Sequence, residues 1–149
     1  YGISYLTRAT VALIGLGANL MEDSVYPQLS GLHGSYVLHF KQLPPTSSFW
    51  SITAYDKDGF TQPNAANRAH ISSWMKLNYE KDGSLKIYLQ ESMHPSNWLP
   101  VPKGEYNVTL RIYSPSIDGW IPAPVKREVK ITYILLFFAV AYTTKKLWI

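Results

Sequence analysis

The stretch from Phe49 to Phe60, FWSITAYDKDGF, limits the choice of fold more than any other part of the chain. Its first half alternates with the period of two that is typical of a half-buried strand. One face carries Trp50, Ile52 and Ala54, and the other carries Phe49, Ser51, Thr53 and Tyr55. Residues 56–59 (DKDG) favour a tight turn, because Asp tolerates and Gly freely adopts left-handed backbone. The stretch therefore predicts an antiparallel strand that ends in a hairpin turn.

Three further segments alternate in the same way, at 35–40, 85–90 and 106–113. A second turn is expected at 81–84 (KDGS), joining a strand at 77–79 to the strand at 85–90, and a last strand is expected at about 125–131. The segments 21–34, 61–75 and 93–103 are predicted to be irregular, because Pro, Gly and Asn interrupt them. Several short strands at such spacing predict a mainly β fold, a jelly-roll-like antiparallel β-sandwich.

A helix is expected near the start of the chain, between Tyr1 and Leu20. Apolar residues recur there in steps of three and four, at Leu6, Ala9, Leu13, Leu16 and Leu20. That spacing places them on one face of a helix, with Ser4 as a plausible N-cap. Arg8, Asn19 and two glycines interrupt the face, so we expect it to pack in the core and not to span a membrane.

The length of 149 residues suits one domain with a sizeable core. The absence of cysteine excludes disulfides, thiolate metal sites and a cysteine nucleophile. The formal net charge is only +4 and most basic residues are scattered, so nucleic-acid binding is not expected. Charged residues make up 16% of the chain and aromatic residues 14%. A chain so rich in aromatic residues and so poor in charge suits a β-sandwich, a binding face or a protein buried in an assembly.

Seven pieces of the chain resemble domain of unknown function 1214. They are LTRATVALIGLGANL, YVLHF with LPP, FWSITAYDKDGF, Asn67-Arg68, LNYEKDGSLKIYLQ, NWLPVPKGEYNVTLRIYSP and the W-x-P-x-P run from Trp120 to Pro124. They keep the family's order from about Tyr1 to Val129. The resemblance implies a jelly-roll β-sandwich with an N-terminal helix, and no agreed activity. It also implies the C-terminal part of exported bacterial proteins whose N-terminal part is domain of unknown function 1254.

No catalytic or cofactor motif is evident in the sequence. His33, His39, His70 and His94 are not at ligand spacing, so no metal or other cofactor is expected. Asp56 and Asp58 are explained by their turn, and the chain lacks a G-x-S-x-G elbow, a P-loop and a dinucleotide fingerprint. We therefore predict no catalytic residues and favour a non-catalytic protein.

One set of residues suggests a ligand site. The set is Arg111, Tyr113, Asn97, Trp98, Gln90 and Tyr88. Arg111 and Tyr113 share one face of the predicted strand at 106–113, where a guanidinium beside aromatic rings could hold a carboxylate or phosphate. The alternative, which we favour, is that Arg111 binds main-chain carbonyls of the NWLP loop at 97–100 and stiffens the fold.

The most apolar run is ITYILLFFAVAY at 131–142. As a helix it would reach only ~18 Å, whereas the hydrocarbon core of a bilayer is ~30 Å thick. It is therefore expected to be a pair of core or edge strands, a membrane-inserted or interfacial tail, or a segment that docks on a partner. The residues expected to make membrane or partner contacts are Ile134, Leu135, Leu136, Phe137, Phe138 and Val140. We accordingly divide the chain into a β-sandwich domain at 1–130 and a tail at 131–149.

Two functional hypotheses follow. The first is a structural or accessory subunit of a larger assembly, with other protein subunits as partners and a membrane as a further one through the tail. The second is a small-molecule-binding protein or enzyme that uses the Arg111 and Tyr113 face and the Asn97-Trp98 loop. For either, an exported, organellar or membrane-associated location is favoured over the free cytoplasm.

Overall fold

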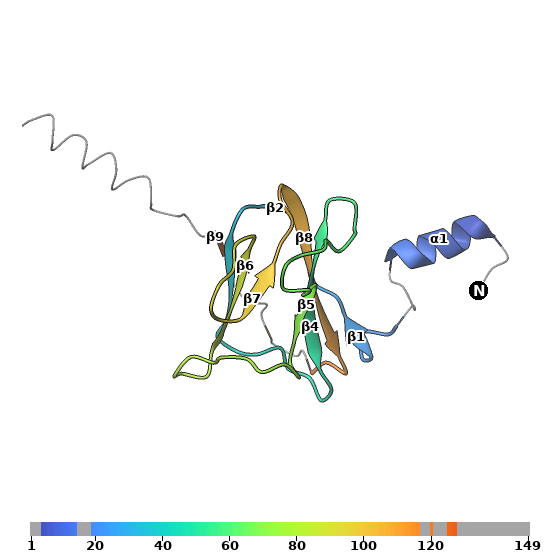
Figure 1. Ribbon diagram of the computed structural model, residues 1–149. Helices are drawn as coiled ribbons and strands as arrows, with labels where there is room; N and C mark the ends of the chain where they lie inside the picture. The colour runs from blue at the N-terminus through green and yellow to red at the C-terminus, as the bar shows by residue number, and fades with distance from the viewer. Residues whose placement is uncertain (1–3, 15–18, 117–119, 121–124, 128–149) are drawn as a thin grey trace, which may run out of the picture.

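The computed structural model describes residues 4–14, 19–116, 120 and 125–127. Within them the chain forms two β-sheets that face each other as a sandwich (Figure 1), which confirms the predicted fold class. The elements are α1 (Tyr5–Ile14), β1 (Ser24–Val25), β2 (Gln28–His33), β3 (Tyr36–Phe40), β4 (Trp50–Asp56), β5 (His70–Ser72), β6 (Leu85–Gln90), β7 (Trp98–Pro100), β8 (Glu105–Tyr113) and β9 (Val125–Arg127).

The first sheet is built around β8, the longest strand described. Along one edge β8 pairs antiparallel with β4, from Trp50 opposite Ile112 to Asp56 opposite Tyr106. Its other edge pairs first with β1 and then with β2, and β5 adds to the far side of β4. The two alternating segments that dominate the sequence are therefore neighbours at the centre of one sheet.

The second sheet has the strand order β7-β6-β3-β9. β6 and β9 both pair antiparallel with β3, whereas β7 pairs parallel with β6. This sheet is therefore mixed, although the sequence predicts purely antiparallel pairing. A parallel neighbour needs a crossover in place of a tight hairpin. Residues 91–97 provide this connection by looping back beside β6.

The core lies between the two sheets, and the alternation predicts which side chains enter it. From β4, Trp50, Ile52 and Ala54 are buried, as expected. The inward residues of the other long strands are also buried: Leu38, Phe40, Leu85, Ile87, Leu89, Tyr106, Val108, Leu110 and Ile112. Each alternating strand thus gives one face to the core and leaves the other on the outside of the sandwich.

Both predicted turns form, but neither joins two paired strands directly. At the end of β4, Gly59 has φ +86° and its amide bonds to the Asp56 carbonyl. The next strand to pair with β4 is β5, which begins only at His70. The turn at 80–84 closes through Gly83, which has φ +80°, but residues 77–79 form no strand. Prediction of the turns was correct, and prediction of two tight hairpins was wrong.

Four strands lie in segments predicted to be irregular. β1 and β2 occupy part of 21–34, β5 part of 61–75, and β7 part of 93–103. In β2 the pairing with β8 shifts register between Leu29 and Leu32, and Gly31 lies in this bulge with φ +68°. These strands carry Pro, Gly or polar residues, and pairing with a long neighbour decides their conformation.

The helix α1 lies within the predicted range, and the prediction that its apolar face packs in the core was wrong where side chains are described. Ser4 lies at the N-cap position, since its carbonyl accepts the first helical hydrogen bond from Arg8. Leu6 is 77% exposed, and Ala9 is also exposed. Leu20, beyond the helix, is exposed as well. Figure 1 shows α1 standing apart from the sandwich.

Two further expectations concern the membrane and the tail. Among the residues that the structure describes, no helix is long and apolar enough to cross a bilayer. The predicted tail at 131–149, with all of its expected contact residues, lies outside the described residues. The division into a domain at 1–130 and a tail therefore stays a prediction.

Candidate functional site

Large aromatic side chains gather on the outer side of the first sheet, around a single arginine. We call this surface the aromatic face, and its members are Tyr26, Phe49, Tyr55, Trp74, Arg111 and Tyr113. Their places follow from strand alternation. On β8, Arg111 and Tyr113 alternate with the buried Leu110 and Ile112, so they project away from the core, as the sequence predicts.

Four aromatic rings of this face form a continuous row of contacts in space. The Phe49 ring stacks on Tyr113 with 4.5 Å between centroids, and it meets Trp74 edge to face at 4.8 Å. Tyr113 in turn meets Tyr26 edge to face at 6.1 Å. These geometries are the favourable ones for aromatic pairs. Trp74 nevertheless remains 61% exposed, so part of the cluster faces water.

The Arg111 guanidinium is held by side chains of the neighbouring strand β4. It donates one hydrogen bond to the Tyr55 hydroxyl at 2.8 Å and one to Thr53 Oγ1 at 3.2 Å. It also lies 5.6 Å from the centroid of the Tyr55 ring, within range of a cation–π interaction. The expected bonds to carbonyls of the NWLP loop were a wrong prediction. None of the ion pairs between described residues includes Arg111.

Two tyrosines beside Arg111 have pKa values shifted in opposite directions. The Tyr26 hydroxyl accepts hydrogen bonds from Ser24 Oγ at 2.8 Å and Asn19 Nδ2 at 2.8 Å. The Ser24 bond does most to lower the pKa of Tyr26, and the Arg111 charge also lowers it. Burial chiefly raises the pKa of Tyr113. At this edge of the aromatic face, the hydroxyl groups of Tyr26 and Tyr113 thus lie near the positively charged guanidinium of Arg111.

The structure places three other predicted site residues on the second sheet, away from Arg111. Asn97 is buried, and its amide nitrogen donates to the carbonyls of Asn78 at 2.6 Å and Lys86 at 2.9 Å. The Trp98 indole donates to the Gln90 carbonyl at 2.8 Å. Gln90 is buried too, although the sequence predicts it on the outer side or in a cleft. The side chains of all three residues donate hydrogen bonds to main-chain carbonyls.

Tyr88 lies two residues before Gln90 on β6, and its ring stacks on His94 at 3.6 Å. The predicted set of six residues is thus divided between the two sheets. Arg111 and Tyr113 share the aromatic face, Tyr88 lies on β6, and Asn97, Trp98 and Gln90 anchor β7. Sequence reasoning did not select Tyr26 and Trp74, which join the face only through tertiary contacts.

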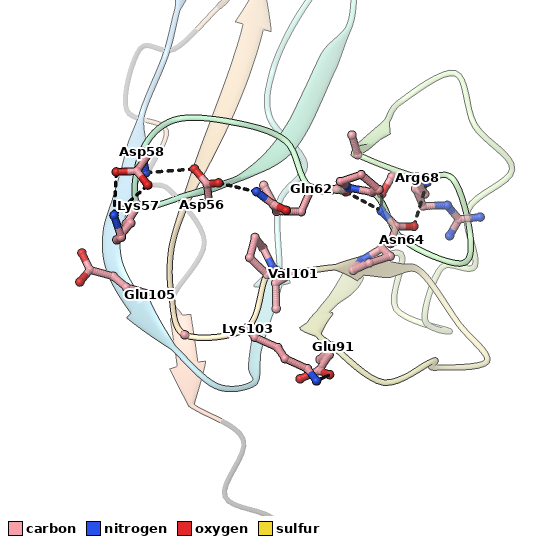
Figure 2. A pocket seen from close by; sticks show the side chains of 16 residues that line it. Asp56, Lys57, Asp58, Gln62, Asn64, Arg68, Glu91, Val101, Lys103 and Glu105 are labelled. Carbon is pink, nitrogen blue, oxygen red and sulfur yellow. Dashed lines mark hydrogen bonds and ion pairs between the residues drawn. The ribbon is translucent and has the colours of Figure 1, made fainter.

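A separate polar cleft of 660 Å³ lies between the turn after β4 and the loop from β7 to β8. Figure 2 shows Asp56, Gln62 and Asn64 on one side of it, and Lys103 and Glu91 on the other. Asp56 accepts hydrogen bonds from the amides of Asp58 at 3.0 Å and Phe60 at 2.9 Å. The Phe60 amide does most to lower the pKa of Asp56. This carboxylate therefore holds the turn together, as predicted.

Most other charges around the cleft have partners of their own. Lys57 pairs with Asp58 at 2.8 Å, and Lys103 pairs with Glu91 at 3.2 Å. Arg68 donates to the Trp98 carbonyl at 2.9 Å, the loop contact that the sequence assigned to Arg111. The described residues contain no cluster of three or more His, Asp or Glu suited to a metal ion. The cleft thus presents mainly satisfied polar groups, and the aromatic face is the stronger candidate for a functional site.

Comparisons with known families and structures agree with this fold. A family model described as "Protein of unknown function (DUF1214)" matches residues 16–117. No curated protein matches the chain.

Two solved structures are similar to the chain. The VPA0106 protein from Vibrio parahaemolyticus has a TM-score of 0.68 and 23% identity, over 81% of this chain and 34% of that one. A putative uncharacterized protein from Burkholderia cenocepacia has a TM-score of 0.50 and 16% identity, over 75% of this chain and 31% of that one. The chain thus spans about a third of the length of these proteins, and at such identities the likeness shows the fold alone.

Proposed function

The chain belongs to the DUF1214 family of proteins of unknown function, and we propose that it is a non-catalytic module of a larger assembly that docks on another protein through the aromatic face. The observation that carries this proposal is the cluster of Phe49, Tyr113 and Trp74 beside Arg111, in which Trp74 is 61% exposed and the other two rings are half-buried. Trp, Tyr and Arg are the residues that most often dominate the energy of protein–protein binding. Covering such rings also removes apolar area from water.

The arrangement favours a protein partner over a small molecule. The rings are spread along the outer side of a sheet, and Arg111 lies among them. Sites for small molecules are usually concave and enclose most of the ligand. A sheet face of this kind instead suits the broad surface of a second protein. We therefore place the enzyme or small-molecule hypothesis second.

The charge of Arg111 specifies part of the partner's chemistry. Tyr55 and Thr53 orient the guanidinium without neutralising it, and no described ion pair involves it. A carboxylate on the partner, set among apolar or aromatic groups, would complete the face. Charge-assisted bonds between a guanidinium and a carboxylate are short and strong. Such complementarity selects one partner over others.

Two further parts of the proposal concern the surroundings of the module. The longer matched structures support a domain that works in the company of others. We also propose that Ile134 and the other apolar residues of the tail contact a membrane or a partner subunit. An exported, organellar or membrane-associated location fits both contacts.

A photo-crosslinking amino acid in place of Trp74, in the full chain expressed in its native cells, tests the docking proposal. The matched control carries the same group at Phe60, which is 68% exposed but is not part of the aromatic face. We expect one defined protein adduct from position 74 and none from position 60. Equal labelling from both positions would overturn the proposal.

The substitution Arg111→Met tests the role of the charge. Methionine keeps much of the packing but removes the cation, so the adduct from position 74 should fall at least tenfold. Since two hydrogen bonds are lost at a partly exposed site, the free energy of unfolding should fall by only about 1–2 kcal/mol. If this variant forms the adduct as well as the parent chain does, Arg111 takes no part in docking.

A further inference from the structure

Among the described residues, the two sheets touch along one side and leave an apolar pocket, partly open to solvent, toward the other. Where they touch, β5 contacts β7, and Arg68 bridges to the Trp98 carbonyl. Toward the opposite side, β2 of the first sheet and β3 of the second line a cavity of 210 Å³. The residues that line this cavity are Pro27, Gln28, Leu29, Leu38, Phe40, Ile52, Val108 and Leu110.

The lining is apolar apart from one group at the rim. Leu38 and Phe40 from β3 face Val108 and Leu110 from β8, and all four are buried. Gln28 is the single polar side chain in the lining, and it is exposed, with its amide donating to Ser30 at 3.2 Å. A cavity without polar partners does not hold ordered water well and takes up apolar molecules instead. The cavity therefore has an apolar interior and a polar rim.

The volume limits what can enter. Pockets for drug-sized ligands are about 300–1,000 Å³, whereas an apolar cavity of ~150 Å³ is large enough for benzene. At 210 Å³ the cavity suits a slender group better than a fused ring system. We propose that it binds the unbranched alkyl chain of an amphiphile, with the chain between the sheets and the polar head in water beside Gln28.

This proposal is independent of the docking function, because the cavity lies between the sheets and the aromatic face lies on their outer side. A homologous series of straight-chain alkanols, from 1-butanol to 1-dodecanol, provides the probe. Each methylene that enters the cavity contributes ~0.8 kcal/mol, which is roughly a fourfold gain in affinity. We expect the affinity to rise by about this factor per carbon and then level off once the cavity is full.

Methyl NMR on the full chain locates the bound alkanol. We expect saturable shifts, and contacts with alkanol methylenes, at Leu29, Leu38, Val108 and Leu110. An affinity that does not change with chain length, or shifts spread over the whole surface, would overturn the proposal. So would contacts between these methyl groups and residues 131–149 of the chain itself, because the tail would then be the occupant.

A filling substitution gives a second test. Leu29 is half-buried at the mouth of the cavity, so Leu29→Phe should fill it and weaken 1-octanol binding at least tenfold. Leu43→Phe is the matched control, because Leu43 is also half-buried against the core but does not line the cavity. Equal octanol binding by the two variants would contradict the proposal. The alkanol series on the unmodified chain keeps the proposal testable if Leu29→Phe does not fold.

Discussion

Asn97 offers the sharpest test of whether a predicted site residue binds a ligand or supports the fold. Its Oδ1 accepts from the Asn78 amide at 2.9 Å, and its Nδ2 donates to the carbonyls of Asn78 and Lys86. The side chain thus ties the segment before β6 to the entry of β7. The substitution Asn97→Asp keeps the size of the side chain but replaces both donated hydrogens with an acceptor.

The expected cost follows from these contacts. Two donated hydrogen bonds are worth about 1 kcal/mol each, and a buried acceptor left without a donor costs a further ~1–3 kcal/mol. We expect Asn97→Asp to lower the free energy of unfolding by ~3 kcal/mol or more. For a domain of this size, each kcal/mol shifts the melting temperature by about 2–4 °C, so the shift should be roughly 6–12 °C. Protonation restores one donor, so the loss should be smaller at pH 4 than at pH 7.

Urea and thermal unfolding, followed by tryptophan fluorescence, measure this loss. Asn78→Asp is the matched control, because the Asn78 side chain is exposed and makes one long bond of 3.3 Å to Ser96. It should change the free energy of unfolding by less than ~0.5 kcal/mol. If Asn97→Asp is as stable as this control, Asn97 is not a support of β7 and the reasoning fails.

Three other substitutions test separate parts of the fold. Tyr106→Phe removes a buried hydroxyl that donates to a main-chain carbonyl in the turn before β3, and it should lower the free energy of unfolding by about 1 kcal/mol at pH 7. Burial raises the pKa of Tyr106 above that of a tyrosine in the unfolded chain, so the stability of the parent chain should fall as the pH rises above about 10. The fall should be smaller in the variant. Asp56→Asn should abolish the titration of the Phe60 amide signal in NMR. Because the pKa of Asp56 is lower in the folded than in the unfolded chain, the stability that its carboxylate contributes is present above the unfolded-state pKa and is lost as the pH falls through the folded-state pKa. Arg68→Met removes a charged donor from the Trp98 carbonyl and should cost about 2 kcal/mol in urea unfolding.

Controls for these three use the same assays. Arg127→Met alters an exposed arginine and should leave stability within ~0.5 kcal/mol of the parent chain, so an equal loss in both arginine variants would speak against the Arg68 bridge. A Phe60 amide signal that still titrates in Asp56→Asn would assign the titration to another group. An unchanged alkaline profile in Tyr106→Phe would show that this phenol does not cause the loss.

The candidate site was only partly predictable. Alternation along β8 correctly placed Arg111 and Tyr113 on one outward face, because in a regular strand neighbours two apart point the same way. Trp74 reaches this face from the end of β5, a strand that the sequence did not indicate. Sequence also grouped Asn97 with Arg111, although they lie on different sheets. Alternation within a strand does not indicate which of the two sheets the residues after a loop will join.

The sequence by itself determined the period of each long strand, the side of it that is buried and the positions of the glycine turns. These features depend on the chemistry of a few consecutive residues: the size and polarity of alternate side chains and the freedom of glycine at positive φ. Only the tertiary structure decided that β7 runs parallel to β6, that β1 and β2 share one edge of β8, and that Arg68 holds the loop assigned to Arg111. These outcomes depend on hydrogen bonds between segments that are not neighbours in the sequence, which a short segment forms only when a longer strand offers it an unpaired edge.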